Sequence, residues 1–421
     1  MQPQENSQQA VQKALLIGLD TGEYDAQASL AELETLAVSA GAEVEGVLLQ
    51  RRPAPEAATV IGQGKLEEAA EFCKVQEIDL AVFDCELSPA QMRNIERVLH
   101  TAVIDRTALI LDIFARRAVT AEGKLQVELA QLQYRLPRLS GIGTALSRLG
   151  GGIGTRGPGE TQLETDRRHI HRRIAALKKE LGQLEKRRAL HRQRRQKEGV
   201  ISIAIVGYTN VGKSTLLNAL TGAGVLAENR LFATLDPTSR GLELPDGRNV
   251  MLIDTVGFVR RLPHHLVEAF HSTLEEAVEA DLIWCVCDAS SEEAEAQAAV
   301  AKKLLAELEA RAPVLIVLNK CDTALPAPGS FFGEHTVNIS ARTGEGLESL
   351  LRKTTEMLEP AHQRMQLYLP YGKERLLAEI RQEGRIYHMD YEPEGMRIDA
   401  LVEKRLIPKA APYDARGQSL S

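Results

Sequence analysis

The chain has 421 residues and a net charge of −7, and its 44% hydrophobic and 26% charged residues exclude fibrous and disordered chains. No apolar run approaches the ~20 residues that cross a bilayer, and the polar N-terminus lacks a secretory signal pattern. The five cysteines are scattered without zinc-type spacing, so we expect reduced thiols in a cytoplasmic protein.

Residues 1–139 alternate short apolar runs with helical patterns. The expected strands are 14–20, 43–50, 79–84 and 101–106, and the expected helices are 26–39, 65–75, 88–99 and about 121–139, with Pro137 near the end of the last. Alternating strands and helices predict an α/β domain with a parallel sheet. IGQGKLEE (61–68) contains a G-x-G without the third glycine of a dinucleotide motif, so a loop or a helix start is the better interpretation.

Residues 140–199 differ in composition from the rest. They begin with a loop at 140–161 that holds eight glycines, which favour a segment that orders against a partner. From 161 to 199, apolar residues recur with the 4-3 spacing of a heptad seam, at Ile170, Ile174, Leu177, Leu181 and Leu184. The same stretch has 13 Lys and Arg against 5 Asp and Glu. We predict a basic helical hairpin or coiled coil, with a merely solvated helix face as the alternative.

Two further blocks follow. Residues 200–360 carry four buried-strand patterns that end in polar residues: ISIAIVG, NVMLIDTVG, DLIWCVCD and VLIVLNKCD. Ligands of open α/β sheets bind beyond the carboxyl ends of strands, so this pattern indicates a ligand-binding site at that edge of the sheet. Cys285 and Cys287 are expected to be buried strand residues. Residues 361–421 read as strand, helix near 372–383, and two more strands, which predicts a small βαββ unit.

The clearest motif is G-x-x-x-x-G-K-[ST] at 207–214, between a strand and a helix. Converging backbone N–H groups hold phosphates, and glycines let the backbone approach them closely. Lys213 is predicted to reach the β- and γ-phosphates, and Ser214 to ligate Mg²⁺. Asp254 opens a D-x-x-G and is predicted to hold Mg²⁺ through water, while the Gly257 N–H senses the γ-phosphate.

An N-K-x-D motif at 319–322 selects the base. The Asp322 carboxylate can accept from both N1–H and the exocyclic amine of guanine, whereas adenine would leave it unpaired. Ser340 and Ala341 end another short strand pattern, where a backbone N–H can meet guanine O6. The three motifs in this order predict a guanine nucleotide site.

Three positions concern hydrolysis. A switch threonine is expected to complete Mg²⁺ coordination, and spacing does not choose between Thr234 and Thr238. Phe258 stands where many GTPases carry a Gln that orients the attacking water. Water must therefore be placed by backbone groups, by a monovalent cation or by a bound partner. Asn210 occupies the place where some related GTPases hold K⁺, which makes K⁺ dependence a hypothesis.

GYTNVGKST, FATLDPT, DTVGFV and NKCD together resemble the HflX family of TRAFAC-class GTPases, and GTRGPGETQLETDRR is a further hallmark of it. The resemblance favours Thr234 over Thr238. It implies Lys213, Thr234 and Gly257 as catalytic residues, and Ser214 and Thr234 as Mg²⁺ ligands. The nucleotide contacts that it implies are Gly207, Tyr208, Thr209, Asn210, Val211, Gly212, Lys213, Ser214, Thr215, Phe232, Ala233, Thr234, Leu235, Asp236, Asp254, Thr255, Val256, Gly257, Asn319, Lys320, Cys321, Asp322, Ser340, Ala341 and Arg342.

The resemblance also implies the fold class and the domains. We expect an α/β protein whose P-loop GTPase domain at 200–360 follows an N-terminal α/β domain at 1–139 and a glycine-rich loop with a basic coiled-coil arm at 140–199. A small α+β domain at 361–421 comes last, and it carries the least resemblance to the family.

The function so implied is a monomeric, Mg²⁺-using GTPase that binds GTP and GDP, binds the large (50S) ribosomal subunit and its rRNA, and splits stalled or idle ribosomes under stress. Basic side chains on a helix suit the rRNA backbone, where contacts are electrostatic. The alternatives are a GTPase of RNA modification or ribosome assembly, and a regulatory binding module, for example of a membrane protease. The expected location is the cytoplasm, and the alternative is that a fraction of the protein also associates peripherally with the membrane.

Overall fold

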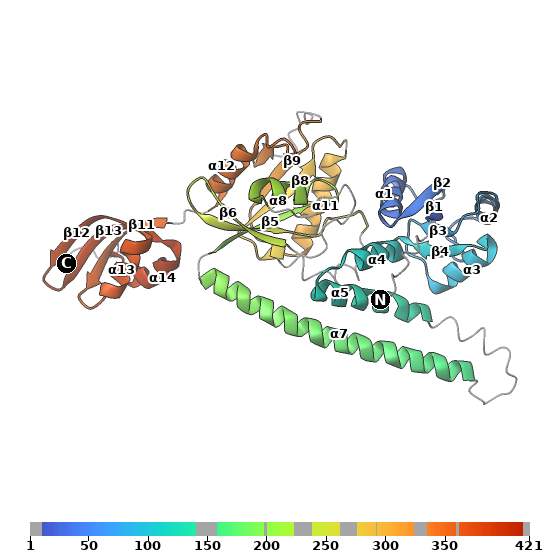
Figure 1. The fold of residues 1–421 in the computed structure, drawn as a ribbon, viewed down its shortest axis with the longest axis horizontal. Coiled ribbons are helices and arrows are strands. Elements are labelled where there is room, and N and C mark those ends of the chain that lie inside the picture. The colour runs from blue at the N-terminus through green and yellow to red at the C-terminus, as the bar shows by residue number, and fades with distance from the viewer. Residues whose placement is uncertain are drawn as a thin grey trace, which may run out of the picture.

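The computed structural model describes residues 11–139, 158–197, 200–222, 238–261, 276–291, 293–323, 335–358 and 362–415. Three separate sheets follow one another along the chain, and the first and last lie at opposite ends of the molecule (Figure 1). We call the parts that contain them the N-terminal unit (11–139), the central unit (200–358) and the C-terminal unit (362–415). The mixture of parallel sheets, helices and a final antiparallel sheet confirms the predicted α/β class.

In the N-terminal unit the four strands are all parallel and run in the order β2-β1-β3-β4. The strands are β1 (Gln12–Asp20), β2 (Ala42–Arg51), β3 (Leu80–Phe83) and β4 (Ala102–Asp105). Helices cover both faces: α1 (Ala26–Ser39), α4 (Arg106–Arg117) and α5 (Ala121–Leu139) on one, and α2 (Gln63–Gln76) and α3 (Pro89–Leu99) on the other. The expected strands and helices are confirmed, and α4 is an additional helix that the sequence pattern did not indicate.

Local sequence explains where these helices begin. The Asp25 carboxylate accepts a hydrogen bond from the Ala28 N–H at the start of α1. Ser88 and Gln91 form a capping box at the start of α3, with Pro89 as its first residue. Gly62 caps α2, so IGQGKLEE is a helix start, one of the two interpretations expected for it.

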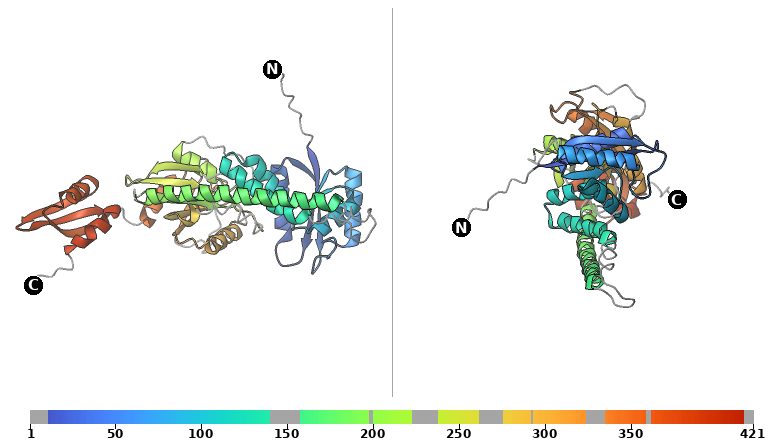
Figure 2. Two further views of the ribbon diagram at one scale, coloured as in Figure 1. Left: turned by 90° about the horizontal axis from the view of Figure 1, so that it is seen from below. Right: turned by 90° about the vertical axis from the view of Figure 1, so that its right-hand side faces the viewer.

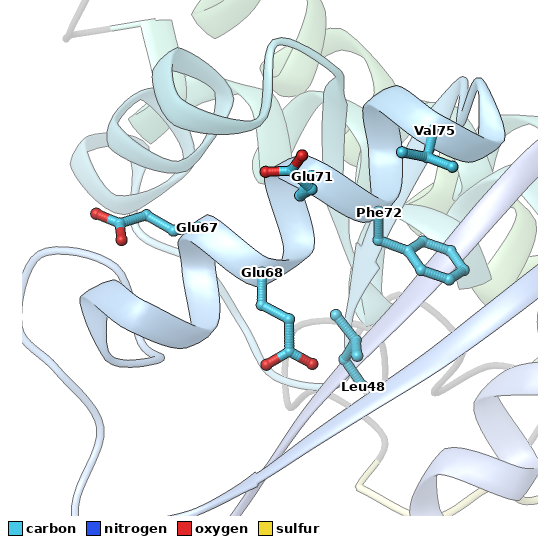
Figure 3. Close-up of a pocket in the computed structure, with 6 residues that line it drawn as sticks. All are labelled: Leu48, Glu67, Glu68, Glu71, Phe72 and Val75. Carbon is cyan, nitrogen blue, oxygen red and sulfur yellow. The ribbon is translucent and has the colours of Figure 1, made fainter.

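A recess of about 490 Å³ lies between β2 and α2 of the N-terminal unit (Figure 3). Leu48, Phe72 and Val75 provide its apolar lining, and its other lining residues are Glu67, Glu68 and Glu71. The lining contains three carboxylates, of which Glu68 is paired with Lys65 at 2.8 Å, and no basic side chain, so it disfavours the phosphates of a nucleotide. This recess is therefore electrostatically unsuited to a second nucleotide.

A single long helix, α7 (Pro158–Lys197), lies beside α5 and extends along the molecule toward the central unit (Figures 1 and 2). Of the predicted apolar seam, Leu177 is fully buried, and the other four members are half-buried: Ile170, Ile174, Leu181 and Leu184. One continuous helix forms here rather than the hairpin that the sequence also allowed. Two ion pairs fasten α7 to α5: Arg173 with Glu128 at 2.7 Å and Arg188 with Glu122 at 2.6 Å. The helix begins at 158 rather than at 161, since proline suits the first helical position.

In the central unit the strand order is β10-β9-β8-β5-β7-β6, with β6 antiparallel to β7 and the other pairs parallel. The strands are β5 (Ile201–Gly207), β6 (Thr238–Glu243), β7 (Asn249–Asp254), β8 (Leu282–Asp288), β9 (Val314–Asn319) and β10 (Thr336–Asn338). The helices are α8 (Lys213–Thr221), α11 (Ala294–Glu307) and α12 (Leu347–Met357). Cys285 and Cys287 are buried free thiols of β8, as expected.

The C-terminal unit is the predicted βαββ arrangement. It consists of β11 (His362–Pro370), α13 (Glu374–Glu383), β12 (Arg385–Glu392) and β13 (Gly395–Glu403), followed by the short helix α14 (Ile407–Ala410). Its antiparallel order is β11-β13-β12. Met365, Leu367 and Leu369 alternate inward along β11, which is the two-residue period of a sheet with one buried face. Among the described residues, no helix is both long enough and apolar enough to cross a membrane.

Candidate nucleotide-binding site

The loop between β5 and α8 has the backbone that a phosphate loop needs. Gly207 has φ +150°, and a Cβ there would lie 2.2 Å from the Val286 carbonyl oxygen. Gly212 has φ +95°, and its Cβ would lie 2.3 Å from Asn319 Nδ2. Neither position tolerates a side chain, so the glycines allow the loop to close tightly over the carboxyl ends of the strands. Helix α8 begins at this point, and the N–H groups in the first turn of a helix have no partner within the helix, which suits them to bind an anion.

Lys213 reaches back over this loop. Its ammonium donates to the carbonyl oxygens of Tyr208 at 2.8 Å and Gly207 at 3.2 Å, and the side chain is buried. Burial lowers the pKa of Lys213 to about 8, and the nearby Asp254 carboxylate acts in the opposite direction. A buried cation fixed at the centre of the loop is suited to hold a polyphosphate.

Ser214 and Asp254 meet at the mouth of the sheet. The Ser214 hydroxyl donates to Asp254 Oδ2 at 2.8 Å, and Asp254 at the end of β7 is fully buried. A hydroxyl and a carboxylate held side by side next to a phosphate loop form the oxygen donor set that Mg²⁺ prefers. These two residues therefore fit a magnesium ion.

The D-x-x-G segment lies directly against the phosphate loop. The Phe258 N–H donates to the Gly207 carbonyl at 3.0 Å, and the Thr209 N–H donates to the Phe258 carbonyl at 2.9 Å. A Cβ on Gly257 would lie 2.7 Å from Thr209 Cγ2 and 2.9 Å from Lys213 Nζ, so only glycine permits this approach. The Phe258 ring is buried in the core of the central unit. The residue at the usual glutamine position is thus a buried aromatic side chain that cannot hydrogen-bond to water.

The N-K-x-D segment joins the phosphate loop to the loop at 340–342. The Asn319 amide donates to the Val211 carbonyl at 2.8 Å, and its Oδ1 accepts from the Ala341 N–H at 2.9 Å. Asp322 accepts from the Ser340 hydroxyl at 2.7 Å and pairs with Arg342. The Ser340 hydroxyl, with help from Arg342, holds the pKa of the Asp322 carboxyl below its ordinary value.

The structure thus brings the residues predicted from three motifs to one edge of the central sheet. A backbone N–H of Ser340 or Ala341 is expected from the sequence to meet guanine O6. In the structure the Ser340 N–H donates to the Glu345 carbonyl and the Ala341 N–H donates to Asn319. Lys320 pairs with Asp288 at 2.6 Å, a contact that no motif indicated. Thr255 serves the fold, because its hydroxyl donates to the Ile205 carbonyl at 2.8 Å. Thr238 is the first residue of β6.

Five expected contacts, Phe232, Ala233, Thr234, Leu235 and Asp236, lie outside the described residues, as do Arg148 and Arg156 of the glycine-rich loop. Sequence reasoning also missed contacts of Tyr208 and Arg260 with Glu32 of the N-terminal unit. In the sequence, the two arginines that follow DTVGFV are the one pattern that indicates these contacts. No motif surrounds Glu32.

Comparisons with known proteins agree with this geometry. Three family models match successive parts of the chain: "GTP-binding GTPase N-terminal" at 27–115, "GTP-binding GTPase Middle Region" at 117–195 and "50S ribosome-binding GTPase" at 202–320. The GTPase HflX of Caldanaerobacter subterraneus is 49% identical over 392 residues, which are 93% of this chain and 91% of that protein.

Two further relatives carry the same name. The GTPase HflX of Lacrimispora saccharolytica is 48% identical over 95% of this chain and 96% of its own length. The GTPase HflX of Escherichia coli is 43% identical over 93% of this chain and 92% of its own length. With such identity across nearly the whole length, the chain belongs to the HflX family of GTP-binding, GTP-hydrolysing enzymes.

Proposed function

We propose that this GTPase binds the large (50S) ribosomal subunit through its rRNA and splits stalled or idle ribosomes under stress. The exposed basic surface of α7 is the observation that carries the proposal. Its exposed cations are Arg168, Arg172, Arg173, Lys178, Lys179, Lys186, Arg187 and Arg194. A 40-residue helix that buries Leu177 on one side leaves this surface open to a phosphate backbone.

At the nucleotide site, we assign the phosphates to the loop at 207–215 and to Lys213, and the guanine base to Asp322. Mg²⁺ would be held by Ser214, by Thr234 and, through water, by Asp254, and it would neutralise charge on the β- and γ-phosphates. Lys213 adds a fixed positive charge where negative charge develops during hydrolysis.

No side chain among the described residues of the D-x-x-G segment orients the attacking water, since the Phe258 ring is buried. In this proposal that orientation comes from backbone groups, from a monovalent cation such as K⁺ beside Asn210, or from the bound ribosome. We therefore expect slow hydrolysis by the protein alone and faster hydrolysis on the large subunit.

Sedimentation of 70S ribosomes through sucrose gradients tests the proposal. The protein with a non-hydrolysable GTP analogue should convert 70S particles to separate 50S and 30S particles and migrate with the 50S fraction. The variant Lys178→Gln/Lys179→Gln/Arg187→Gln should dissociate from 50S particles at a lower salt concentration than the wild type does, because each lost phosphate contact removes affinity.

A matched control removes three exposed cations that lie on other elements than α7, namely on β2, α11 and α13. The variant Arg51→Gln/Lys303→Gln/Arg375→Gln replaces side chains that are 87%, 81% and 95% exposed. If this control loses 50S binding as strongly as the α7 variant, binding follows overall charge and α7 is not the interface. Intact 70S particles with bound protein would instead favour a role in ribosome assembly or RNA modification, which mass analysis of the rRNA would reveal.

A further inference from the structure

The segment that follows β7 divides its side chains between two units. Phe258 packs in the core of the central unit, whereas Val256 and Val259 belong to the apolar cluster formed by α1, α4 and α5 of the N-terminal unit. All three residues lie within two positions of Gly257 in the sequence. The N-terminal unit is therefore packed directly against the segment that faces the γ-phosphate position.

A single carboxylate lies at the centre of this contact. Glu32 on α1 is 10% exposed at its side chain and accepts hydrogen bonds from the Tyr208 hydroxyl and from Arg106. It also accepts from the Arg260 backbone N–H at 3.1 Å, and the Arg260 guanidinium lies 3.9 Å away. Glu32 thus contacts both the second residue of the phosphate loop and the third residue after Gly257.

Arg106 keeps Glu32 in place and compensates its charge. The guanidinium is 3% exposed and lies between Glu32 and Asp84, with 2.7 Å to Asp84 Oδ1. It also donates to the Arg260 carbonyl at 3.1 Å. Burial raises the pKa of Glu32, and the positive charge of Arg106 acts in the opposite direction.

Arg261 extends the contact by one residue. Its guanidinium donates to the Asp84 carbonyl at 3.0 Å and lies 4.2 Å from the centre of the Tyr24 ring. Both consecutive arginines are thus tied to the N-terminal unit, Arg260 through its backbone N–H to Glu32 and Arg261 through its guanidinium, which also lies 3.5 Å from Asp84 Oδ2. The Arg260 guanidinium itself pairs with Glu293 of the central unit at 2.8 Å. Neither arginine is free to move without breaking a partly buried pair.

We propose that Glu32 is a positioning residue of the nucleotide site, supplied by the N-terminal unit. It holds Tyr208 of the phosphate loop and Arg260 in a fixed relation, so that the Gly257 N–H stays aimed at the γ-phosphate. The proposal rests on the nucleotide assignment given above. Because Phe258 cannot orient water, hydrolysis depends on this backbone geometry, and small displacements of a reacting group cost large factors in rate.

The test compares four proteins by steady-state GTP hydrolysis: wild type, Glu32→Gln, Tyr208→Phe and the double variant. We expect Glu32→Gln to lower kcat about tenfold while KM for GTP and Kd for GDP change less than about twofold. The double variant should be no slower than Glu32→Gln alone, since both changes break the same contact. Glu34→Gln, an exposed carboxyl on the same helix, should match the wild type.

Three results would overturn the assignment: an unchanged kcat in Glu32→Gln, a change confined to KM, or rate effects of the two substitutions that multiply. A purely structural role would lower Tm without lowering the kcat of the folded fraction. Tyr208→Phe removes only a hydroxyl and keeps the Glu32–Arg106 pair, so it tests the idea even where Glu32→Gln folds poorly. If the wild type itself hydrolyses no GTP, the nucleotide assignment fails instead.

Discussion

At the scale of single residues, the site depends on a few side chains whose neighbours fix their chemistry. Asp322 is held by Ser340 and Arg342. Asn319 bonds to both the phosphate loop and the loop that contains Ala341. Motif spacing alone identified these residues, because each motif is local in sequence. What spacing did not indicate is how the neighbours hold them.

We predict that Asp322 selects guanine over a wide pH range. The Ser340 hydroxyl holds the pKa of the Asp322 carboxyl below its ordinary value, so the group is ionised throughout the neutral and mildly acidic range and loses its charge only at still lower pH. The ratio of Kd values for IDP and GDP should therefore be constant from pH 5 to 8, because phosphate protonation affects both nucleotides equally. Inosine lacks the exocyclic amine, so the ratio reports this contact.

In Asp322→Asn the IDP to GDP ratio should fall at least about tenfold, because the amide cannot accept from both guanine donors. Isothermal titration calorimetry measures both affinities. An unchanged ratio in the variant would mean that Asp322 does not contact the base.

We predict that K⁺ accelerates hydrolysis through Asn210, whose φ is +63°. The rate in KCl should exceed the rate in NaCl at equal ionic strength. Asn210→Gly removes the amide but keeps the left-handed backbone at no steric cost, so it should abolish the difference. Equal wild-type rates in the two salts would count against a cation at this position.

At the scale of elements, most strands and helices follow from hydrophobic period. The exceptions have physical reasons. Strand β6 reads TSRGLE and is largely exposed at the edge of the sheet, so no alternation marks it. Helix α4 begins directly after β4, and it is buried on several sides, with Leu109, Ile110, Leu111 and Ile113 all inside. Its apolar residues therefore do not recur with the spacing of a one-sided helix. Both elements depend on neighbours that are distant in sequence.

We predict that the α5–α7 contact depends on Leu177, which is fully buried. Leu177→Ala should destabilise the pairing by about 2–4 kcal/mol, because the lost side chain leaves a cavity. Hydrogen exchange of amides in α5 and α7 measures this local loss. Leu190→Ala, on the same helix at 66% exposure, should change protection by less than about 0.5 kcal/mol. Equal effects of both changes would show that the seam does not hold the helices together.

At the scale of the whole molecule, the contact between the N-terminal unit and the phosphate loop could not be predicted from sequence. The Glu32–Tyr208 bond joins residues 176 positions apart, and the Glu32–Arg260 bond spans 228 positions. No local pattern records such a pairing. The structure therefore adds a link between the N-terminal unit, whose helix α5 is paired with α7, and the site of hydrolysis.

This arrangement leads to the most direct test of the account, which is the rate of GTP hydrolysis with and without purified 50S subunits. The account predicts at least about a tenfold higher kcat in their presence. It also predicts that Lys178→Gln/Lys179→Gln/Arg187→Gln retains the basal rate but needs more 50S for the same stimulation. A wild-type rate that is the same with and without 50S subunits would contradict the account.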